Sequence, residues 1–393
     1  MIHCIEEQFG QFCMLRDPEP GRAEDVLITF SAADTPPGKF LWSKRLRGDR
    51  HKQVYLNCPS NNWYLRGIPG IGNTPEAVAS GLNRLIKERF PGAGRICATG
   101  GSMGGYGAIV IGSLMGVDSI LAFGAELTLG LSGSNSAKHV SDDGGLLTRE
   151  LKRTKASVRL VYGENFFPDL LSVLNVKELI EKPSVDIITL CDRPHSIPPY
   201  LEKKYGLNKI VNSLFSGGAL PIDQSEIGSI LSYPWLVRVG YACQEFMRTG
   251  ELLGSVNQYL DLLNSQVLDD LPDRYAAYAL AFRAMLNQAN RNFNLALNDL
   301  ILAAHKNSYN LLIMSIAGRV ALRCGEFQMA SQYSKRAIEL QEPELFNLEL
   351  DNYIVAARSA IQIGHKQEAR EILSECLALR PNFRRATLLL SQI

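Results

Sequence analysis

Short, continuous apolar runs alternate with helical stretches through the first half of the chain. The runs are rich in β-branched and aliphatic residues, and glycine-rich turns lie among them. Continuous apolar runs separated by helices are typical of a mostly parallel sheet that helices cover on both faces. Six runs predict buried strands, over residues 26–30, 53–57, 95–99, 119–123, 159–162 and 186–190.

The segment before the third of these runs has the spacing of an amphipathic helix, which we predict over residues 75–90. Its apolar residues recur on one helical face, at Val78, Leu82, Leu85 and Ile86. Thr74 is a favourable N-cap for this helix, and Pro75 suits its first position. Residues 4–15 predict a short antiparallel hairpin that turns near Gly10 and extends the sheet at one edge.

The pattern changes near residue 220. A segment rich in glycine, serine and proline occurs there, with the composition of an inter-domain connection. Beyond it, nearly every segment has helical periodicity. We therefore predict an α/β domain over residues 1–218, a linker over 219–236 and an all-α domain over 237–393.

Three alanines, Ala296, Ala330 and Ala369, occupy equivalent places in the helical half. The first two are separated by about 34 residues, the period of the tetratricopeptide repeat. Small or aromatic residues recur at fixed distances from these alanines: Phe293, Phe327, Ala303, Ala337, Cys376, Gly325 and Gly364. Two prolines, Pro343 and Pro381, close the second and third segments.

These positions resemble those of the tetratricopeptide (TPR) repeat family, in which a small residue lets two antiparallel helices approach closely. The resemblance implies paired helices over residues 237–393 that bind a partner protein. The alternatives are an unrelated helical bundle and an arm that serves only self-association or packing.

Composition and charge narrow the class of protein. A formal net charge of +1 without basic stretches gives no reason to expect a nucleic-acid partner. No apolar run approaches the length of a membrane span, and the first residues lack the pattern of a signal peptide. The eight cysteines are scattered singly, which predicts reduced thiols. We therefore expect a cytoplasmic protein that needs no cofactor or metal.

A candidate nucleophile follows the third apolar run. Residues 100–104 read Gly-Gly-Ser-Met-Gly, with Ser102 at the centre, and a helix-forming segment follows at 105–111. This strand–turn–helix setting resembles the nucleophile elbow of the α/β-hydrolases, where flanking glycines let a serine adopt a strained conformation. The alternative is a tight glycine turn without chemistry.

A nucleophilic serine needs a base, and the chain offers six histidines: His3, His51, His139, His195, His305 and His365. In α/β-hydrolases the order along the chain is serine, acid, histidine. Two histidines precede Ser102 and two lie in the helical half. His195, in the loop after the last apolar run, is our predicted base. His139 lies in a Gly/Ser/Asp-rich insertion, and we expect it to be either a surface residue or a substrate contact.

The acid is expected after the preceding strand. Two carboxylates follow the run at 159–162, namely Glu164 and Asp169. We favour Asp169, placed just before a helix predicted over 170–180, because it has the reach to meet His195. Glu164 is the alternative, and Asp192 is so near His195 in sequence that we expect it to shape the loop.

An oxyanion hole needs two N–H donors. One is expected from the backbone of Met103. The other is expected from the loop after the first apolar run, at Ala32, where small residues at 31–33 permit close backbone approach to a substrate.

Residues 1–215 thus resemble the α/β-hydrolase superfamily, with the elbow, the acid and the histidine in order. The resemblance implies an esterase-type serine hydrolase that forms an acyl-enzyme. The segment 61–67 and a short cap over 127–157 also resemble bacterial proteins tied to surface glycans, some of which transfer O-acetyl groups. The alternatives are therefore an O-acyltransferase that uses the same triad, and an inactive hydrolase-fold scaffold that carries an interaction module.

Overall fold

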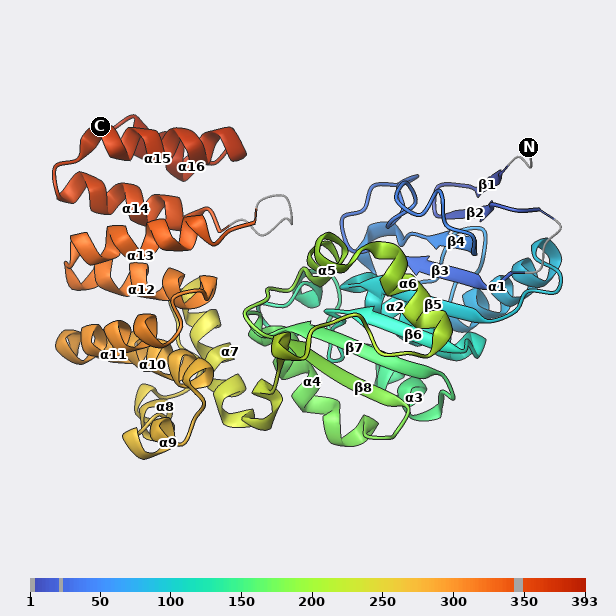
Figure 1. The fold of residues 1–393 in the computed structure, drawn as a ribbon, viewed down its shortest axis with the longest axis horizontal. Coiled ribbons are helices and arrows are strands. Elements are labelled where there is room, and N and C mark those ends of the chain that lie inside the picture. Colours follow the sequence, from blue (N-terminus) through green and yellow to red (C-terminus); the bar gives the residue numbers. More distant parts are fainter. Residues whose placement is uncertain (1–3, 21–23, 343–348) are drawn as a thin grey trace. The chain divides into compact units, whose positions relative to one another are not determined.

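The computed structural model describes residues 4–20, 24–342 and 349–393. His3 and Pro343, named above, lie outside the described residues. The chain divides into two compact units, Met1–Ser232 and Tyr233–Ile393 (Figure 1). Residues 219–232 of the predicted linker belong to the first unit.

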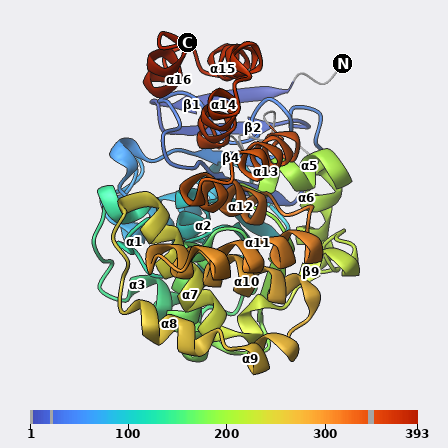
Figure 2. The same ribbon diagram turned by 90° about the vertical axis from the view of Figure 1, so that its left-hand side faces the viewer.

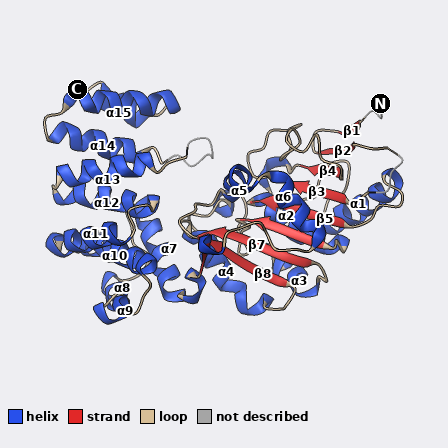
Figure 3. Ribbon diagram, viewed as in Figure 1, coloured by secondary structure: helices blue, strands red, loops and turns tan. Residues whose placement is uncertain are grey.

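The first unit is built on a nine-stranded sheet with the order β1-β2-β4-β3-β5-β6-β7-β8-β9. Strands β3 to β8 run parallel, and β2 is antiparallel to β4. The strands are β1 (Ile5–Phe9), β2 (Cys13–Asp17), β3 (Val26–Phe30), β4 (Lys52–Leu56), β5 (Ile96–Gly101), β6 (Ser119–Phe123), β7 (Ser157–Gly163), β8 (Val185–Leu190) and β9 (Ile227–Gly228). This arrangement, with helices on both faces, is the predicted α/β-hydrolase fold (Figure 3).

The six predicted strands are confirmed as β3 to β8, with ends that differ by one or two residues. All residues of β3, β4 and β6 are buried, as expected for strands covered on both faces. The predicted hairpin is confirmed as β1 and β2, which pair antiparallel. The short β9 was not predicted, because two residues carry no periodicity.

The described residues of the first unit form six α-helices: α1 (Pro75–Arg89), α2 (Met103–Met115), α3 (Leu146–Arg153), α4 (Phe167–Ile180), α5 (Ile197–Tyr205) and α6 (Leu207–Ser216). Helix α1 begins as predicted, with the Ala77 N–H donating to Thr74 Oγ1 at 3.2 Å. Helices α1 to α4 pack in a row, each against the next, and α5 packs against α6.

The second unit is helical throughout its described residues. Its helices are α7 (Pro234–Thr249), α8 (Val256–Leu262), α9 (Ser265–Asp269), α10 (Asp273–Ala289), α11 (Phe293–Lys306), α12 (Leu311–Cys324), α13 (Phe327–Glu339), α14 (Asp351–Gln362), α15 (Lys366–Leu379) and α16 (Arg384–Leu390). Helices α10 to α16 lie stacked one on another (Figures 1 and 2). None of the described helices is both long and apolar enough to cross a membrane.

Small residues let consecutive helices of this unit approach closely. A Cβ on Gly318 of α12 would lie 2.2 Å from Ser334 Oγ of α13. The three equivalent alanines, Ala296, Ala330 and Ala369, are all completely buried. Gly325, at the end of α12, has a φ of 85° and closes the helix in the left-handed conformation.

Candidate active site

Ser102 lies in the turn between β5 and α2 with φ 54° and ψ −124°. A positive φ is strained for a residue with a side chain, and such strain concentrates at functional sites. The Ser102 N–H donates to Phe123 O at 2.7 Å, which fixes the turn against β6. The strained turn holds the serine side chain, partly exposed, at the carboxyl end of the parallel strands.

The flanking glycines are required by the packing around this turn. A Cβ on Gly100 would lie 2.3 Å from Gly104 O, and a Cβ on Gly104 would lie 2.1 Å from Phe30 O. Both contacts are with backbone atoms, which have no room to move without displacing a strand or a helix. Glycine at these positions therefore lets α2 begin directly against the end of β3.

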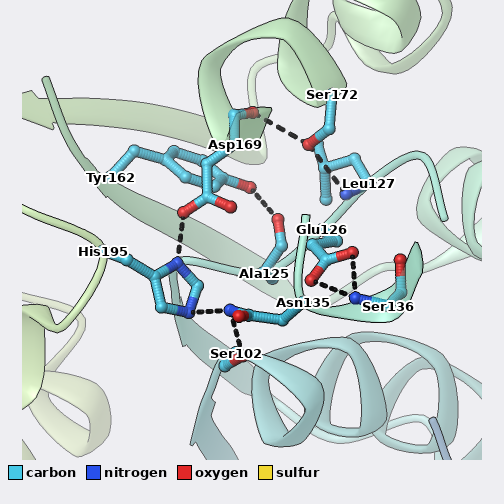
Figure 4. Close-up of polar contacts among 10 residues, drawn as sticks. All are labelled: Ser102, Ala125, Glu126, Leu127, Asn135, Ser136, Tyr162, Asp169, Ser172 and His195. Atoms are coloured by element: carbon cyan, nitrogen blue, oxygen red, sulfur yellow. Dashed lines mark hydrogen bonds and ion pairs between the residues drawn. The ribbon is translucent and has the colours of Figure 1, made fainter. Parts of the chain in front are cut away.

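His195 lies in the loop between β8 and α5, and its side chain is 21% exposed. Its Nδ1 lies 2.6 Å from Asp169 Oδ2 (Figure 4). The ring packs against Phe166, with the ring centroids 5.0 Å apart. Gly124 lies against the ring, because a Cβ there would be 3.1 Å from His195 Cε1. These contacts fix the orientation of the imidazole.

The acid lies inside a helix and not in the loop before it. Helix α4 begins at Phe167, three residues earlier than predicted, because Pro168 suits the first turn. Asp169 is therefore in the first turn of α4, completely buried. Its Oδ1 has no hydrogen-bond partner among the described residues, so its Oδ2 bond to His195 is its main polar contact.

Glu164, the alternative acid, is also buried but points elsewhere. Its Oε1 accepts hydrogen bonds from Thr189 Oγ1 at 2.9 Å and from Ile230 N at 3.1 Å. These bonds join the end of β7 to β8 and to the segment after β9. The carboxylate that the structure brings to His195 is that of Asp169.

The pKa values of these groups follow from burial and mutual charge. Burial lowers the pKa of His195, but the charge and hydrogen bond of Asp169, with a contribution from Glu126, raise it above its ordinary value. Burial raises the pKa of Asp169, against the lowering effect of His195. His195 is therefore a stronger base than a free imidazole.

Asn135 lies between the serine and the histidine (Figure 4). Its Nδ2 is 2.9 Å from His195 Nε2 and 3.4 Å from Ser102 Oγ. Among the hydrogen bonds of the described residues, none joins Ser102 Oγ directly to His195 Nε2. The side chains of Ser102 and His195 are thus connected through the Asn135 amide.

A buried carboxylate holds the loop that carries Asn135. Both oxygens of Glu126 accept from the Ser136 N–H, at 3.0 and 3.1 Å. Leu127 N donates to Ser172 Oγ at 3.1 Å, and this hydroxyl donates to Asp169 O at 2.8 Å (Figure 4). The loop is therefore tied to the first turns of α4, which also carry the acid.

Sequence reasoning missed both Glu126 and Asn135. Asn135 lies in a Gly/Ser/Asp-rich insertion that has no periodicity, so no pattern could assign it a role. Glu126 could have been predicted from its position, since an acidic residue shortly after the buried strand β6 lies at the same edge of the sheet as Ser102 and His195. Burial then raises its pKa above the ordinary value.

The two expected oxyanion donors lie on adjacent segments. Met103 is the first residue of α2, where backbone N–H groups lack intrahelical partners. Ala32 follows β3, and no described group accepts a hydrogen bond from its N–H. Ser31 precedes Ala32 and lies against Gly104, since a Cβ on Gly104 would be 2.9 Å from Ser31 O. Neither N–H group has a hydrogen-bond acceptor among the described residues.

The segment 61–67 supports the loop after β3, which carries Ala32. Trp63 and Tyr64 are buried and both have positive φ angles. Tyr64 Oη donates to Ser31 O at 3.0 Å, next to Ala32. His139 packs against Trp63, with ring centroids 5.8 Å apart, and has no polar contact with Ser102 or His195. Among the described residues, no cluster of side chains is arranged to hold a metal ion.

No protein-family model matches the sequence, and a search of curated proteins returned no match. Several solved structures are similar. The capsule O-acetyltransferase of Neisseria meningitidis serogroup A is 13% identical with a TM-score of 0.35, over 47% of this chain and 85% of that chain. The fluorophosphonate-binding serine hydrolase F of Staphylococcus aureus is 12% identical with a TM-score of 0.36, over 48% of this chain and 89% of that chain.

Acetyl xylan esterase 1 from Thermoanaerobacterium sp. is 15% identical with a TM-score of 0.37, over 50% of this chain and 78% of that chain. Identities and scores this low identify no reaction. The chemistry of this chain is therefore inferred from the residues of its own site.

Proposed function

We propose that the first unit is a serine enzyme of the esterase type, which acts through an acyl-enzyme on Ser102. The observation that carries the proposal is the meeting of three groups at one edge of the sheet. These are the strained Ser102, His195, and the buried Asp169, whose Oδ2 lies 2.6 Å from His195 Nδ1. This arrangement supports the roles of nucleophile, general base and orienting acid for the three groups.

The first half-reaction forms the acyl-enzyme. His195 Nε2 takes the hydroxyl proton of Ser102 while Oγ attacks the carbonyl carbon of the ester. The N–H groups of Met103 and Ala32 stabilise the negative oxygen of the tetrahedral intermediate. When the intermediate collapses, the bond to the alcohol breaks and His195 gives its proton to the leaving oxygen. Asp169 holds the imidazole in one tautomer and stabilises its charged form.

The second half-reaction uses the same residues on a second nucleophile. Water or an acceptor hydroxyl gives its proton to His195 and attacks the acyl carbon, and Ser102 leaves with the proton returned to Oγ. Water gives hydrolysis and a sugar hydroxyl gives O-acyl transfer, so the two activities share every residue of the site. The identity of the acceptor separates them.

Turnover of p-nitrophenyl acetate tests the proposal. We expect wild-type activity to fall by about 10³-fold or more in Ser102→Ala and in His195→Ala. His365→Ala, an exposed histidine of the second unit, is the control and should retain full activity. Mass analysis of products with and without an added glycan then assigns hydrolysis or transfer. If the wild type and all three variants hydrolyse the ester no faster than buffer alone, the result supports the inactive-scaffold alternative instead.

We also propose that the second unit is a tetratricopeptide-like array that binds an acidic segment of a partner protein. Helices α7, α10, α12, α14 and α16 line a groove of about 370 Å³. Five arginines contribute to its lining: Arg248, Arg319, Arg323, Arg358 and Arg385. Asp351 is the one acidic residue among the lining residues.

The positive charge of this groove is only partly compensated within the unit. Asp351 is shared between Arg385 and Arg319. Arg323 donates to the neutral Gln288, and no carboxylate of the described residues lies within ion-pair distance of Arg358. Apolar side chains, Phe246 and Met285 among them, also line the groove. This mixture suits a peptide with both acidic and apolar residues better than a wholly polar polyanion.

A fluorescein-labelled peptide of alternating glutamate and leucine tests this binding on the full chain. Arg323→Gln/Arg358→Gln should weaken binding by about tenfold or more, since charge-assisted hydrogen bonds are lost. Arg380→Gln/Arg384→Gln, outside the groove lining, should leave it unchanged. Equal binding of a lysine–leucine peptide would contradict the proposal. Concentration-dependent dimers that the groove variant abolishes would indicate self-association instead.

A further inference from the structure

We infer that Asn135 competes with both nucleophiles of the reaction for the lone pair of His195, and so limits both half-reactions. The inference rests on the proposed function of the site. It assigns Asn135 a role as a group in contact with the reacting atoms. Its evidence is the position of one amide nitrogen between Ser102 Oγ and His195 Nε2 (Figure 4).

The chemistry of the site determines which atom of the Asn135 amide faces the histidine. His195 Nδ1 faces a buried carboxylate oxygen at 2.6 Å, so this nitrogen carries the proton. In the neutral ring the lone pair is then on Nε2. An amide oxygen 2.9 Å from that lone pair would be repelled, whereas the amide N–H donates to it. The second N–H of the same group faces Ser102 Oγ at 3.4 Å.

This arrangement opposes the first half-reaction. The Ser102 hydroxyl has to donate its proton to Nε2, but the lone pair of Nε2 already accepts from Asn135. The serine oxygen, in turn, faces an N–H donor. Proton transfer from Ser102 to His195 therefore requires the Asn135 side chain to leave first.

The same amide opposes the second half-reaction. The attacking water or acceptor hydroxyl has to lie within hydrogen-bond reach of Nε2, at about 2.6–3.2 Å. Asn135 Nδ2 occupies such a position, 2.9 Å away. The incoming nucleophile has to displace it, and Asn135 thereby affects which acceptors reach the acyl-enzyme.

The backbone around Asn135 is fixed while its side chain is exposed. The neighbouring residues Ser134 and Ser136 are buried, and the Glu126 carboxylate holds the Ser136 N–H. Asn135 itself is exposed, and its Oδ1 accepts no hydrogen bond from the described residues. Rotation of its side chain thus breaks two hydrogen bonds and leaves the loop in place.

Burst kinetics with p-nitrophenyl acetate test the inference. In Asn135→Ala we expect both the acylation and the deacylation rate constants to rise by about 3–10-fold, the range that one net hydrogen bond provides. Lys138→Ala, an exposed change in the same loop, is the control and should alter neither rate constant.

The pH profile supplies a readout that a purely structural role would not change. An N–H donated to Nε2 stabilises the neutral imidazole and so lowers the pKa of His195. Asn135→Ala should therefore move the acidic limb of the profile to higher pH. Asn135→Asp places an acceptor there, stabilises the imidazolium, and should slow both steps at neutral pH.

Three results would overturn the inference. A tenfold loss of acylation in Asn135→Ala would make the amide a contributor to catalysis, and unchanged rate constants with an unchanged pH profile would leave it no role. If wild type and Asn135→Ala are both inactive, the proposed function itself fails, and the inference fails with it. A wild type that is nearly inactive beside an active Asn135→Ala would support the inference strongly.

Discussion

The residues of the site differ in how much of their placement the local sequence determines. Ser102 is held by its neighbours in the chain, because the glycines at 100 and 104 admit backbone contacts that a side chain would block. Asp169 and His195 come together only through the fold, from helix α4 and from the loop after β8. The pKa of His195 depends on this tertiary contact.

The acidic limb of the pH–activity profile should reflect the pKa of His195. A general base works in its neutral form, so activity falls as the pH drops through the pKa of His195. Since Asp169 raises this pKa above 6.5, the limb of kcat/KM should lie above pH 6.5. Asp169→Asn should move the limb to lower pH and reduce kcat by about 10⁴-fold, through loss of the correct tautomer. A limb at lower pH in wild type would contradict this account.

Glu126 also contributes to the pKa of His195. Its charge favours the protonated ring, so Glu126→Gln should shift the acidic limb to lower pH. A pH–rate series on this variant measures the shift, with Glu150→Gln, a buried carboxylate of α3, as the matched control. A limb that moves to higher pH would show that the sign of the interaction is wrong.

At the level of elements, the start of α2 depends on one close approach. A Cβ on Gly104 would lie 2.1 Å from Phe30 O, so Gly104→Ala has to displace either β3 or the elbow. We expect a loss of about 1–3 kcal/mol in the free energy of unfolding, the range of overpacked cores, together with loss of esterase activity.

Gly112→Ala in the same helix is the control for that variant. Its Cβ would lie 3.2 Å from the Ala98 Cβ, a contact that small shifts relieve. Denaturant unfolding and ester turnover should then show a smaller change than in Gly104→Ala. Equal losses in the two variants would contradict a special role for the close approach at Gly104, since alanine has a higher helix propensity than glycine.

The elements also show what the sequence could and could not predict. Strands β3 to β8 were predictable because strands buried on both faces are continuous apolar runs. The predicted start of α4, at residue 170, is three residues too late, because α4 begins at Phe167 with Pro168 in its first turn. The loop that carries Asn135 has no periodicity, and its conformation depends on Glu126 and Ser172, which come from distant segments.

At the level of the whole molecule, composition distinguished an α/β half from a helical half. The boundary lies after Ser232, because the segment expected to be a linker also pairs β9 with β8. Its glycines and prolines indicated irregular backbone but not which unit it packs against. The tetratricopeptide-like character of the helical unit stays a prediction, since small buried residues also occur in other helical arrays.

Reaction with a fluorophosphonate probe measures whether Ser102 is an activated nucleophile. Such a probe forms a stable bond with a serine oxygen only when a base assists the attack. We expect the wild-type chain to be labelled, with the adduct located on Ser102 by peptide mass spectrometry. Ser102→Ala should not be labelled, and His195→Ala should be labelled slowly. If the wild-type chain stays unlabelled while a control esterase reacts fully under the same conditions, Ser102 is not an activated nucleophile.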